Sequence, residues 1–289
     1  MNRLALGTAQ FGQPYGIANQ VGQVTRSAAK AMIEVAAAKG IDTIDTAIAY
    51  GESEICLGEA GAQGFKLVTK LSAVPDSCDD IYGWINDQVS ESLGRLEMIS
   101  MYGLLLHRPE QLLGVKGKVI FQALQQLKES GLVQKIGISI YSPSELDALT
   151  RRHRFDLVQA PFNLIDRRLF TSGWLQRLKQ DGTEIHTRSA FLQGLLLMPR
   201  SEIPSKFATW TELWDKWHKW LACHSVTAVQ ACLAYPLTFA EVDRVVVGAD
   251  SKSQLEQLIG AALTIAPDAL PDLCCHDENL INPARWSQI

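Results

Sequence analysis

The sequence predicts a single (β/α)8 barrel, or TIM barrel, a fold of the α/β class. Short apolar runs alternate with stretches of helical period, and this alternation repeats eight times along the 289 residues. No GxGxxG turn follows the first apolar run, which favours a closed barrel over an open, doubly wound sheet. Because no low-complexity linker divides the chain, residues 1–289 are expected to form one domain, with a tail from about residue 267.

The strands are predicted from apolar runs rich in leucine and β-branched residues, and the helices from the amphipathic stretches between them. The predicted strands are residues 4–7, 43–47, 66–70, 101–106, 135–139, 157–162, 184–189 and 244–247. The predicted helices are residues 27–39, 53–60, 78–96, 118–129, a helix that begins after an N-cap at Ser142, and residues 169–179, 209–222, 228–237 and 251–262. One helix more than the alternation requires therefore precedes the eighth strand.

Composition and charge exclude several classes of protein. The chain is 47% hydrophobic and 20% charged, near the globular average, which argues against a disordered chain or a coiled coil. Its 27 basic and 31 acidic residues give a net charge of −4 and no basic footprint for nucleic acid or a membrane surface. No apolar run approaches the ~18 residues of a membrane span, and the first residues lack the features of a signal peptide. We expect a cytoplasmic protein that binds neither nucleic acid nor a membrane.

Two further patterns have structural interpretations. None of the six cysteines lies in a CxxC pair or at zinc-ligand spacing, so free thiols are expected and no metal site. Trp210, Trp214, Trp217 and Trp220 recur at helical spacing, which predicts one helix face that packs on the barrel. A substrate or partner surface is the alternative interpretation of that face.

Four polar residues fall at or just after the carboxyl ends of consecutive predicted strands, where barrels carry their chemistry. Asp45 follows the second strand, Tyr50 lies in the next loop, Lys70 ends the third strand and His107 ends the fourth. Each residue alone is compatible with a structural role, but chance is a poor explanation for four such residues on neighbouring strands. The sequence therefore predicts a site made of these four side chains.

This combination suits the reduction of a carbonyl group. A buried Lys70 ammonium beside Tyr50 is expected to lower the phenol pKa from about 10, and Asp45 is expected to keep that ammonium charged. The phenol then serves as a proton donor, and the His107 imidazole orients the carbonyl oxygen. No metal pattern or activated nucleophile accompanies the four residues, so the hydride is expected from a bound cofactor.

At these residues the sequence resembles the aldo-keto reductase superfamily. The resemblance rests on motifs that occur in the family's order along nearly the whole chain. They are Leu6-Gly7-Thr8, Asp45-Thr46-Ala47-Ile48-Ala49-Tyr50-Gly51, Val68-Thr69-Lys70, Leu105-Leu106-His107, residues 131–139, Val158-Gln159 and Val246-Val247-Gly248-Ala249. The resemblance implies an NAD(P)H-dependent oxidoreductase that converts an aldehyde or ketone to an alcohol.

The resemblance also implies a role for each matching residue. Tyr50 corresponds to the general acid, Asp45 and Lys70 to the residues that tune it, and His107 to the residue that orients the carbonyl. The residues that match nicotinamide-binding positions are Ser139 and Gln159, with Gly7 and Thr8 beside them.

Two positions near the expected nicotinamide site depart from the family. Ile140 stands where the family usually has asparagine, which removes one side-chain partner for the carboxamide. Arg188 aligns with the aromatic residue that usually stacks on the nicotinamide ring. An arginine here is expected to stack on the ring, to bind the cofactor pyrophosphate, or to bind an anionic substrate; a purely structural ion pair is the remaining interpretation.

The segment after the last strand is expected to bind the adenosine end of the cofactor. By resemblance the residues are Gly248, Ala249, Ser251, Lys252 and Gln254. Lys252 is the only cation there, since Gln254 stands where arginine is frequent. The family favours NADPH, but with one cation available for the 2′-phosphate NADH is the alternative.

Residues after the first strand are expected to form the substrate mouth. Gln10, Phe11 and Tyr15 follow that strand, and with Gln193 and Arg188 they make a polar mouth. This composition favours a polar small-molecule carbonyl, such as a sugar-derived aldehyde or ketone.

Two functions of other classes stay open. Lys70 on the same barrel suits Schiff-base aldolase chemistry without a nicotinamide, although Asp45 opposes the neutral amine that this chemistry needs. The altered cofactor-binding residues of this chain are also compatible with a regulatory or sensor role, in which the cofactor is bound with little turnover.

Overall fold

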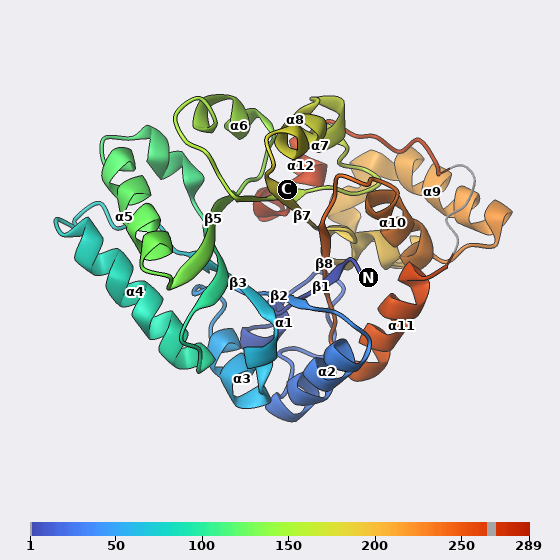
Figure 1. The fold of residues 1–289 in the computed structure, drawn as a ribbon. Coiled ribbons are helices and arrows are strands. Elements are labelled where there is room, and N and C mark those ends of the chain that lie inside the picture. The colour runs from blue at the N-terminus through green and yellow to red at the C-terminus, as the bar shows by residue number, and fades with distance from the viewer. Residues whose placement is uncertain (1, 265–269) are drawn as a thin grey trace.

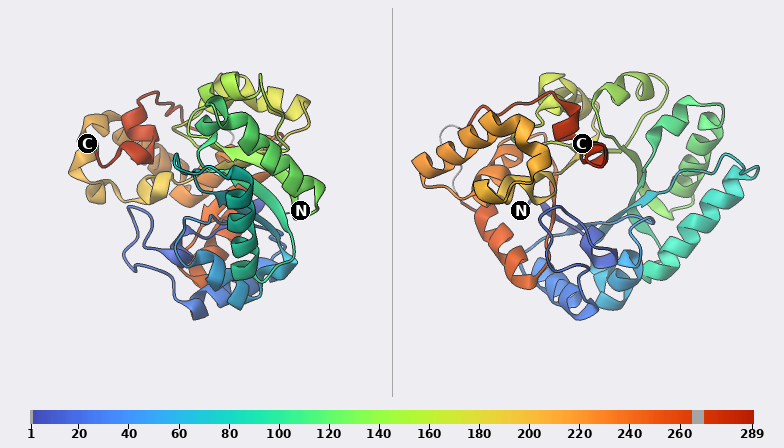
Figure 2. Two further views of the ribbon diagram at one scale, coloured as in Figure 1. Left: turned by 90° about the vertical axis from the view of Figure 1, so that its left-hand side faces the viewer. Right: turned by 180° about the vertical axis from the view of Figure 1, so that it is seen from behind.

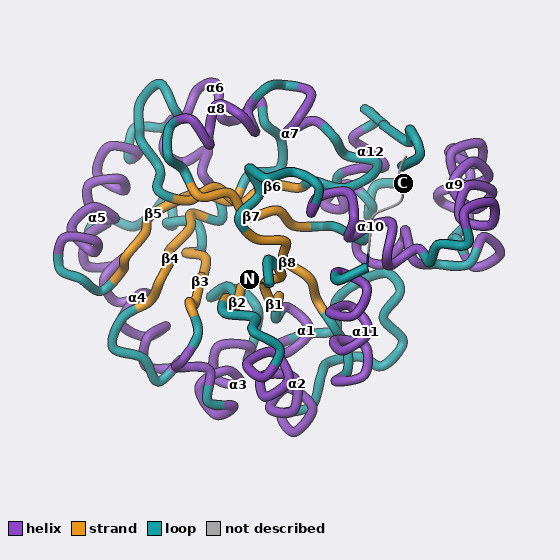
Figure 3. Tube along the Cα trace, turned by 45° about the vertical axis from the view of Figure 1, so that its right-hand side comes forward, coloured by secondary structure: helices purple, strands orange, loops and turns teal. Residues whose placement is uncertain are grey.

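Eight parallel strands close into one barrel in the computed structural model, which describes residues 2–264 and 270–289. Helices surround this barrel, as Figures 1 and 3 show. The strands are β1 (Leu4–Gly7), β2 (Thr43–Asp45), β3 (Lys66–Leu71), β4 (Met101–Leu106), β5 (Val133–Ser139), β6 (Leu157–Pro161), β7 (Glu184–Arg188) and β8 (Arg244–Gly248). The predicted (β/α)8 barrel is therefore confirmed. The predicted start of the tail, about residue 267, lies outside the described residues.

Each strand pairs in parallel with the next, and β1 closes the barrel against β8. The closing register aligns Leu4 with Val245 and Gly7 with Gly248. Residues two apart on a strand face the same side, so one set of side chains fills the barrel and the other packs against the helices. Val68, Leu105 and Leu157 form a small apolar cluster separate from the larger core.

The helices follow the predicted order with local differences. They are α1 (Ala9–Gly12), α2 (Arg26–Ala38), α3 (Ser53–Ala60), α4 (Ile81–Leu96), α5 (Gly117–Glu129), α6 (Ser144–Leu149), α7 (Arg168–Thr171), α8 (Trp174–Gln180), α9 (Thr211–His224), α10 (Ala228–Leu237), α11 (Lys252–Ala262) and α12 (Glu278–Ile281). The predicted helix 169–179 is two helices, because Gly173 adopts a left-handed φ of 78° between α7 and α8. Ser142 is not the N-cap of α6, because the helix starts at Ser144 and its N-cap is Pro143. Glu145 instead accepts a hydrogen bond from the backbone N–H of Ser142 at 2.6 Å.

The tryptophan face of α9 packs against the loop that precedes it. Trp214 and Trp217 are buried, and their indole N–H groups donate to the carbonyl oxygens of Phe207 and Leu196, both at 3.0 Å. Both rings belong to the hydrophobic core that also contains the strand residues Ile185 and Val245, while Figure 3 shows α9 itself at the periphery of the molecule. None of the four tryptophans lines the cavity described below.

The C-terminal segment folds back along the carboxyl ends of the strands. Trp286 is buried against Phe207, with ring centroids 4.9 Å apart. Figure 2 shows this red segment beside the orange helices on one side of the barrel. Pro283 and Ala284 reach the rim of the cavity described below. The tail thus covers part of the carboxyl-terminal end of the barrel, an orientation that the sequence does not reveal.

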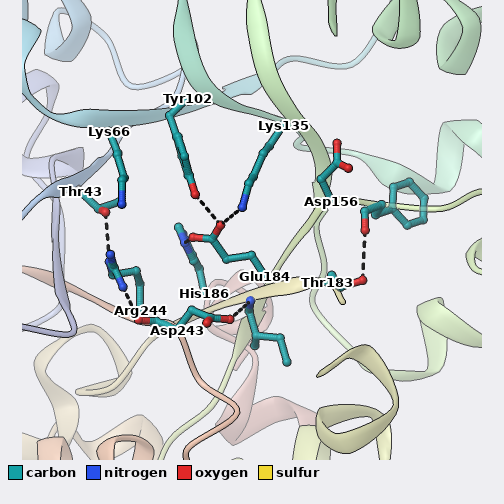
Figure 4. Close-up of polar contacts among 12 residues, drawn as sticks. Thr43, Lys66, Tyr102, Lys135, Asp156, Thr183, Glu184, His186, Asp243 and Arg244 are labelled. Carbon is teal, nitrogen blue, oxygen red and sulfur yellow. Dashed lines mark hydrogen bonds and ion pairs between the residues drawn. The ribbon is translucent and has the colours of Figure 1, made fainter. Parts of the chain in front are cut away.

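A cluster of polar side chains fills the amino-terminal end of the barrel (Figure 4). The Glu184 carboxylate accepts hydrogen bonds from the Tyr102 hydroxyl at 2.7 Å, from His186 Nε2 at 2.7 Å and from Lys135 Nζ. Burial favours a higher pKa for Glu184, but these hydrogen bonds outweigh it and hold the pKa well below its usual range. This end of the barrel is therefore closed by an ionic cluster.

Within residues 2–264 and 270–289, no helix combines the length and apolar character needed to cross a membrane.

Candidate active site

The carboxyl ends of the strands surround a cavity of about 410 Å³. Its size is within the range of small-molecule sites. Most of the residues singled out in the sequence line it: Gly7, Thr8, Gln10, Tyr15, Asp45, Tyr50, Lys70, His107, Ser139, Gln159, Arg188, Gln193, Gly248 and Gln254. The fold thus brings together residues from all eight strands or the loops that follow them.

The base of this cavity is a buried ion pair. Lys70 Nζ donates to Asp45 Oδ2 at 2.6 Å and to the Thr46 carbonyl oxygen at 2.7 Å. Only 1% of the Lys70 side chain is exposed. Gln159 Nε2 donates to the other Asp45 oxygen at 2.6 Å. Burial lowers the pKa of Lys70, and the Asp45 carboxylate opposes that shift, so the carboxylate is what favours the charged ammonium.

Tyr50 lies beside this ion pair and His107. Lys70 Nζ is 5.2 Å from the centre of the Tyr50 ring, and the Tyr50 and His107 rings meet edge to face with centroids 6.1 Å apart. The predicted fall in the phenol pKa is wrong. Burial raises the pKa of Tyr50, and the Asp45 carboxylate adds to the rise. The phenol is therefore protonated at neutral pH and holds a proton that it can donate.

His107 is neutral across the physiological range. Burial lowers its pKa to about 4, and the charges of Lys70 and Arg188 add to the shift. A neutral imidazole carries one N–H donor for a substrate oxygen without adding a positive charge.

Ser139 and Gln159 fit the carboxamide of a nicotinamide ring. They lie side by side at the ends of β5 and β6, with Ser139 Oγ 3.5 Å from Gln159 Oε1. Because the Gln159 amide N–H is engaged by Asp45, its carbonyl oxygen is oriented as an acceptor. Gly7 and Gly248, at the ends of β1 and β8, have close neighbours that leave little space for a side chain. A Cβ on Gly7 would stand 3.0 Å from Val246 Cγ1, and a Cβ on Gly248 would stand 2.3 Å from the Gln10 amide.

The two positions that depart from the family pattern touch each other. Ile140 is fully buried, so its side chain offers nothing to a ligand. Its carbonyl oxygen accepts from Arg188 Nη2 at 2.9 Å. Among the described residues, Arg188 has no carboxylate partner within 4.0 Å, so the interpretation as a structural ion pair is wrong.

Four singled-out residues lie outside the cavity. Phe11 is 1% exposed and belongs to the hydrophobic core, so its predicted place in the substrate mouth is wrong. Ala249 is also buried. Ser251 is the N-cap of α11 and accepts from the Gln254 N–H at 3.2 Å, while Lys252 is exposed at the first turn of that helix. Their predicted contact with an adenosine phosphate is not tested by this geometry.

Several residues at the site were not singled out in the sequence. Tyr141 lines the cavity after β5, and Asn19 joins the loop after β1 to the loop after β8 by donating to Asp250 Oδ1 at 3.4 Å. Gly12 packs directly under the Tyr50 backbone. None belongs to a motif or a strand end, so the sequence pattern carried no signal for them.

Comparisons with known proteins agree with this geometry. The sequence profile of the Aldo/keto reductase family matches residues 3–271. The chain is 29% identical over 182 residues to D-threo-aldose 1-dehydrogenase from a Pseudomonas species, covering 60% of this chain and 55% of that protein. It is 31% identical over 171 residues to 6-dehydroglucose reductase of Agrobacterium fabrum, covering 52% of this chain and 57% of that protein.

The solved structures give the same fold. The holo form of an aldo-keto reductase from Bacillus halodurans superposes with a TM-score of 0.74 at 19% identity, over 95% of this chain and 94% of the other. The chain spans about half the length of the curated relatives that it matches. With the family profile matched from residue 3 to residue 271, the chain belongs to the aldo/keto reductase family.

Proposed function

We propose that the protein reduces an aldehyde or ketone to an alcohol with a nicotinamide cofactor. The observation that carries this proposal is the buried Lys70–Asp45 pair at 2.6 Å beneath a protonated Tyr50, in one cavity with a neutral His107. This set supplies a proton donor and a hydrogen-bond donor for one carbonyl oxygen. The reduced nicotinamide supplies the hydride when it is bound.

Each of the four residues has a distinct task in this proposal. His107 donates a hydrogen bond that orients the carbonyl and polarises it. Tyr50 gives its proton to the oxygen as negative charge develops there, and the nearby Lys70 ammonium stabilises the resulting phenolate. Asp45 holds that ammonium charged and fixed in position.

NADPH is the cofactor that we propose, with NADH as the alternative. Ser139 and Gln159 are assigned to the carboxamide, with Gly7 and Thr8 beside it. The loop after β8 and the start of α11, with Gly248, Ala249, Ser251, Lys252 and Gln254, are assigned to the adenosine end. The exposed Lys252 offers a cation to the 2′-phosphate, and the N-terminus of α11, where Lys252 lies, offers backbone N–H groups.

The substrate that we propose is a polar carbonyl compound of sugar-like character. Gln10, Tyr15, Gln193 and Arg188 contribute hydrogen-bonding groups to the cavity wall. The names of two relatives, an aldose dehydrogenase and a dehydroglucose reductase, support the same class.

Fluorescence titration with NADPH and NADH, followed by turnover on a panel of aldoses and simple aldehydes, tests this proposal. Saturable binding of a reduced cofactor with turnover supports it. Cofactor binding without turnover on the whole panel supports the sensor role instead. If neither cofactor binds and borohydride traps a carbonyl compound on Lys70, Schiff-base chemistry replaces the proposal.

A further inference from the structure

Arg188 is a cation in the cavity that pairs with no carboxylate of residues 2–264 or 270–289. It lines the cavity from the end of β7, partly buried, with no Asp or Glu oxygen within 4.0 Å among the described residues. Lys70 is the other Lys or Arg among the residues that line the cavity, and its ammonium is paired with Asp45. An unpaired charge that is partly withdrawn from water favours a bound anion, because the anion offsets its lost hydration.

The guanidinium points toward β5 and away from β8. Its Nη2 donates to the Ile140 carbonyl oxygen at 2.9 Å, and its carbon lies 4.8 Å from the centre of the Tyr141 ring. Both partners follow β5, which lies two strands from β7 and three strands from β8. The residues assigned to the cofactor phosphates follow β8, so Arg188 faces the other side of the cavity.

The guanidinium is fixed in place yet keeps free donors. Nη1 donates to Ser189 Oγ at 3.2 Å, so two of its five N–H groups are engaged. Three N–H groups stay available for a ligand. A planar group that is held rigidly by a ring and a backbone oxygen suits bidentate contact with a carboxylate.

Arg188 is also close enough to the reacting groups to act on the same small molecule. Burial raises the pKa of Tyr15 and of Tyr50, and the charge of Arg188 opposes both shifts. Burial lowers the pKa of His107, and Lys70 and Arg188 both add to that shift. Tyr50, His107 and Arg188 line one cavity of about 410 Å³, so a substrate whose carbonyl oxygen lies at Tyr50 and His107 can extend to Arg188.

We propose that Arg188 binds a carboxylate on the carbonyl substrate, so that the protein selects oxo-acids over the corresponding neutral carbonyl compounds. This inference rests on the proposed carbonyl reduction and specifies its substrate class. Arg188 is assigned to substrate recognition, and the proton transfer remains with Tyr50.

Kinetics on matched substrate pairs test this assignment. The pairs are glyoxylate with acetaldehyde, 4-oxobutanoate with butanal, and D-glucuronate with D-glucose; each pair differs chiefly in the carboxylate. Wild type, Arg188→Gln and Arg188→Lys are compared by kcat/KM on each substrate and by fluorescence titration with the reduced cofactor. Arg167→Gln is the matched control, because Arg167 also stacks on a tyrosine, 4.9 Å from the Tyr235 ring, and donates to backbone oxygens outside the cavity.

The expected result is that wild type prefers the acid in at least one pair. Arg188→Gln should lower kcat/KM for that acid about 10–100-fold more than for its neutral partner, the scale for losing charge-assisted hydrogen bonds, and the affinity for the reduced cofactor should stay within about twofold of wild type. Arg188→Lys should restore part of the preference, and Arg167→Gln should retain it fully.

Three outcomes overturn the assignment. The first is equal or better use of the neutral member in every pair. The second is a loss of cofactor affinity in Arg188→Gln, which would place Arg188 on the nicotinamide or a phosphate. The third is retention of the acid preference in Arg188→Gln. Failure of the carbonyl reduction itself looks different, because wild type would then turn over no member of any pair.

Discussion

Gly12 supports Tyr50 by direct backbone contact. A Cβ built on Gly12 would stand 1.6 Å from the Tyr50 carbonyl oxygen, far inside van der Waals contact. The turn that carries Tyr50 closes on the same spot, because Gly51, with a φ of +54°, lies against the Gly12 carbonyl oxygen. The end of α1 thus fixes the position of the Tyr50 backbone, and with it the position of the Tyr50 side chain in the cavity.

We expect Gly12→Ala to lower kcat about 10²-fold, because the added methyl group must displace the Tyr50 backbone, and a shift of this size misplaces the proton donor. Steady-state kinetics together with the cofactor titration measure this effect. Gly94→Ala is the control, since a Cβ at Gly94 meets nothing within 4 Å and the change should leave kcat unaltered. Wild-type turnover in Gly12→Ala would show that the contact does not position Tyr50.

Asp45→Asn is expected to destabilise the fold as well as impair the reaction. It leaves Lys70 buried without its charge partner, which costs about 3–5 kcal/mol in the free energy of unfolding. Urea denaturation at pH 7 measures the change. Asp215→Asn breaks a pair of the same 2.6 Å length on the surface, with Arg200, and should cost about 1 kcal/mol or less. Similar costs for the two variants would contradict the burial argument.

The pH profile of kcat/KM is expected to show no step near pH 6.5. Burial, with Lys70 and Arg188, lowers the pKa of His107 to about 4, so the imidazole stays neutral from neutral pH down to that value. As the pH falls through about 4, His107 gains a proton and a charge beside two cations, and kcat/KM should fall. Circular dichroism at each pH separates this step from unfolding. A step near 6.5 that disappears in His107→Asn would contradict the assigned pKa.

The ionic cluster at the amino-terminal end of the barrel should make stability depend on pH. Hydrogen bonds from His186, Lys135 and Tyr102 outweigh burial and depress the folded pKa of Glu184 below the ordinary 4.5. A depressed carboxylate pKa contributes stability above pH 4.5, and the contribution is lost as the pH falls below that value.

We expect Glu184→Gln to lower the free energy of unfolding by about 1–3 kcal/mol at pH 7. In this variant the free energy of unfolding should also fall less steeply as the pH is lowered. Urea titrations at several pH values measure both effects, with Glu129→Gln as an exposed control. An unchanged acid dependence in Glu184→Gln would assign the effect to other carboxylates.

Most of the fold could be predicted because each barrel strand is a short apolar run and each long helix has its own end signals. The strands at residues 4–7 and 101–106 match the structure at both ends. The split between α7 and α8 was missed because a lone glycine inside a helical pattern is tolerated as often as it breaks the helix. The direction of the tail depends on tertiary contacts such as Trp286 with Phe207, which no local pattern encodes.

The four reacting side chains could be predicted because strand ends are recognisable and the barrel brings them to one face. The pKa of Tyr50 could not, because burial in the complete cavity and the Asp45 carboxylate raise it and outweigh the opposing charge of Arg188. Phe11 was misplaced because it lies in α1, a one-turn helix that the sequence did not predict and that buries the ring in the core. Glu184, His186 and Arg188 alternate like residues of a half-exposed strand, yet His186 is fully buried inside the barrel.

The most direct test of the account compares Tyr50→Phe with wild type in kcat and in affinity for the reduced cofactor. The variant keeps the ring beside Lys70 and His107 and removes the phenolic hydroxyl that carries the proton. We predict that kcat falls about 10²–10⁴-fold while cofactor affinity stays within about twofold of wild type. A variant that retains the wild-type kcat would contradict the role of Tyr50 as proton donor, and with it the proposed chemistry of the site.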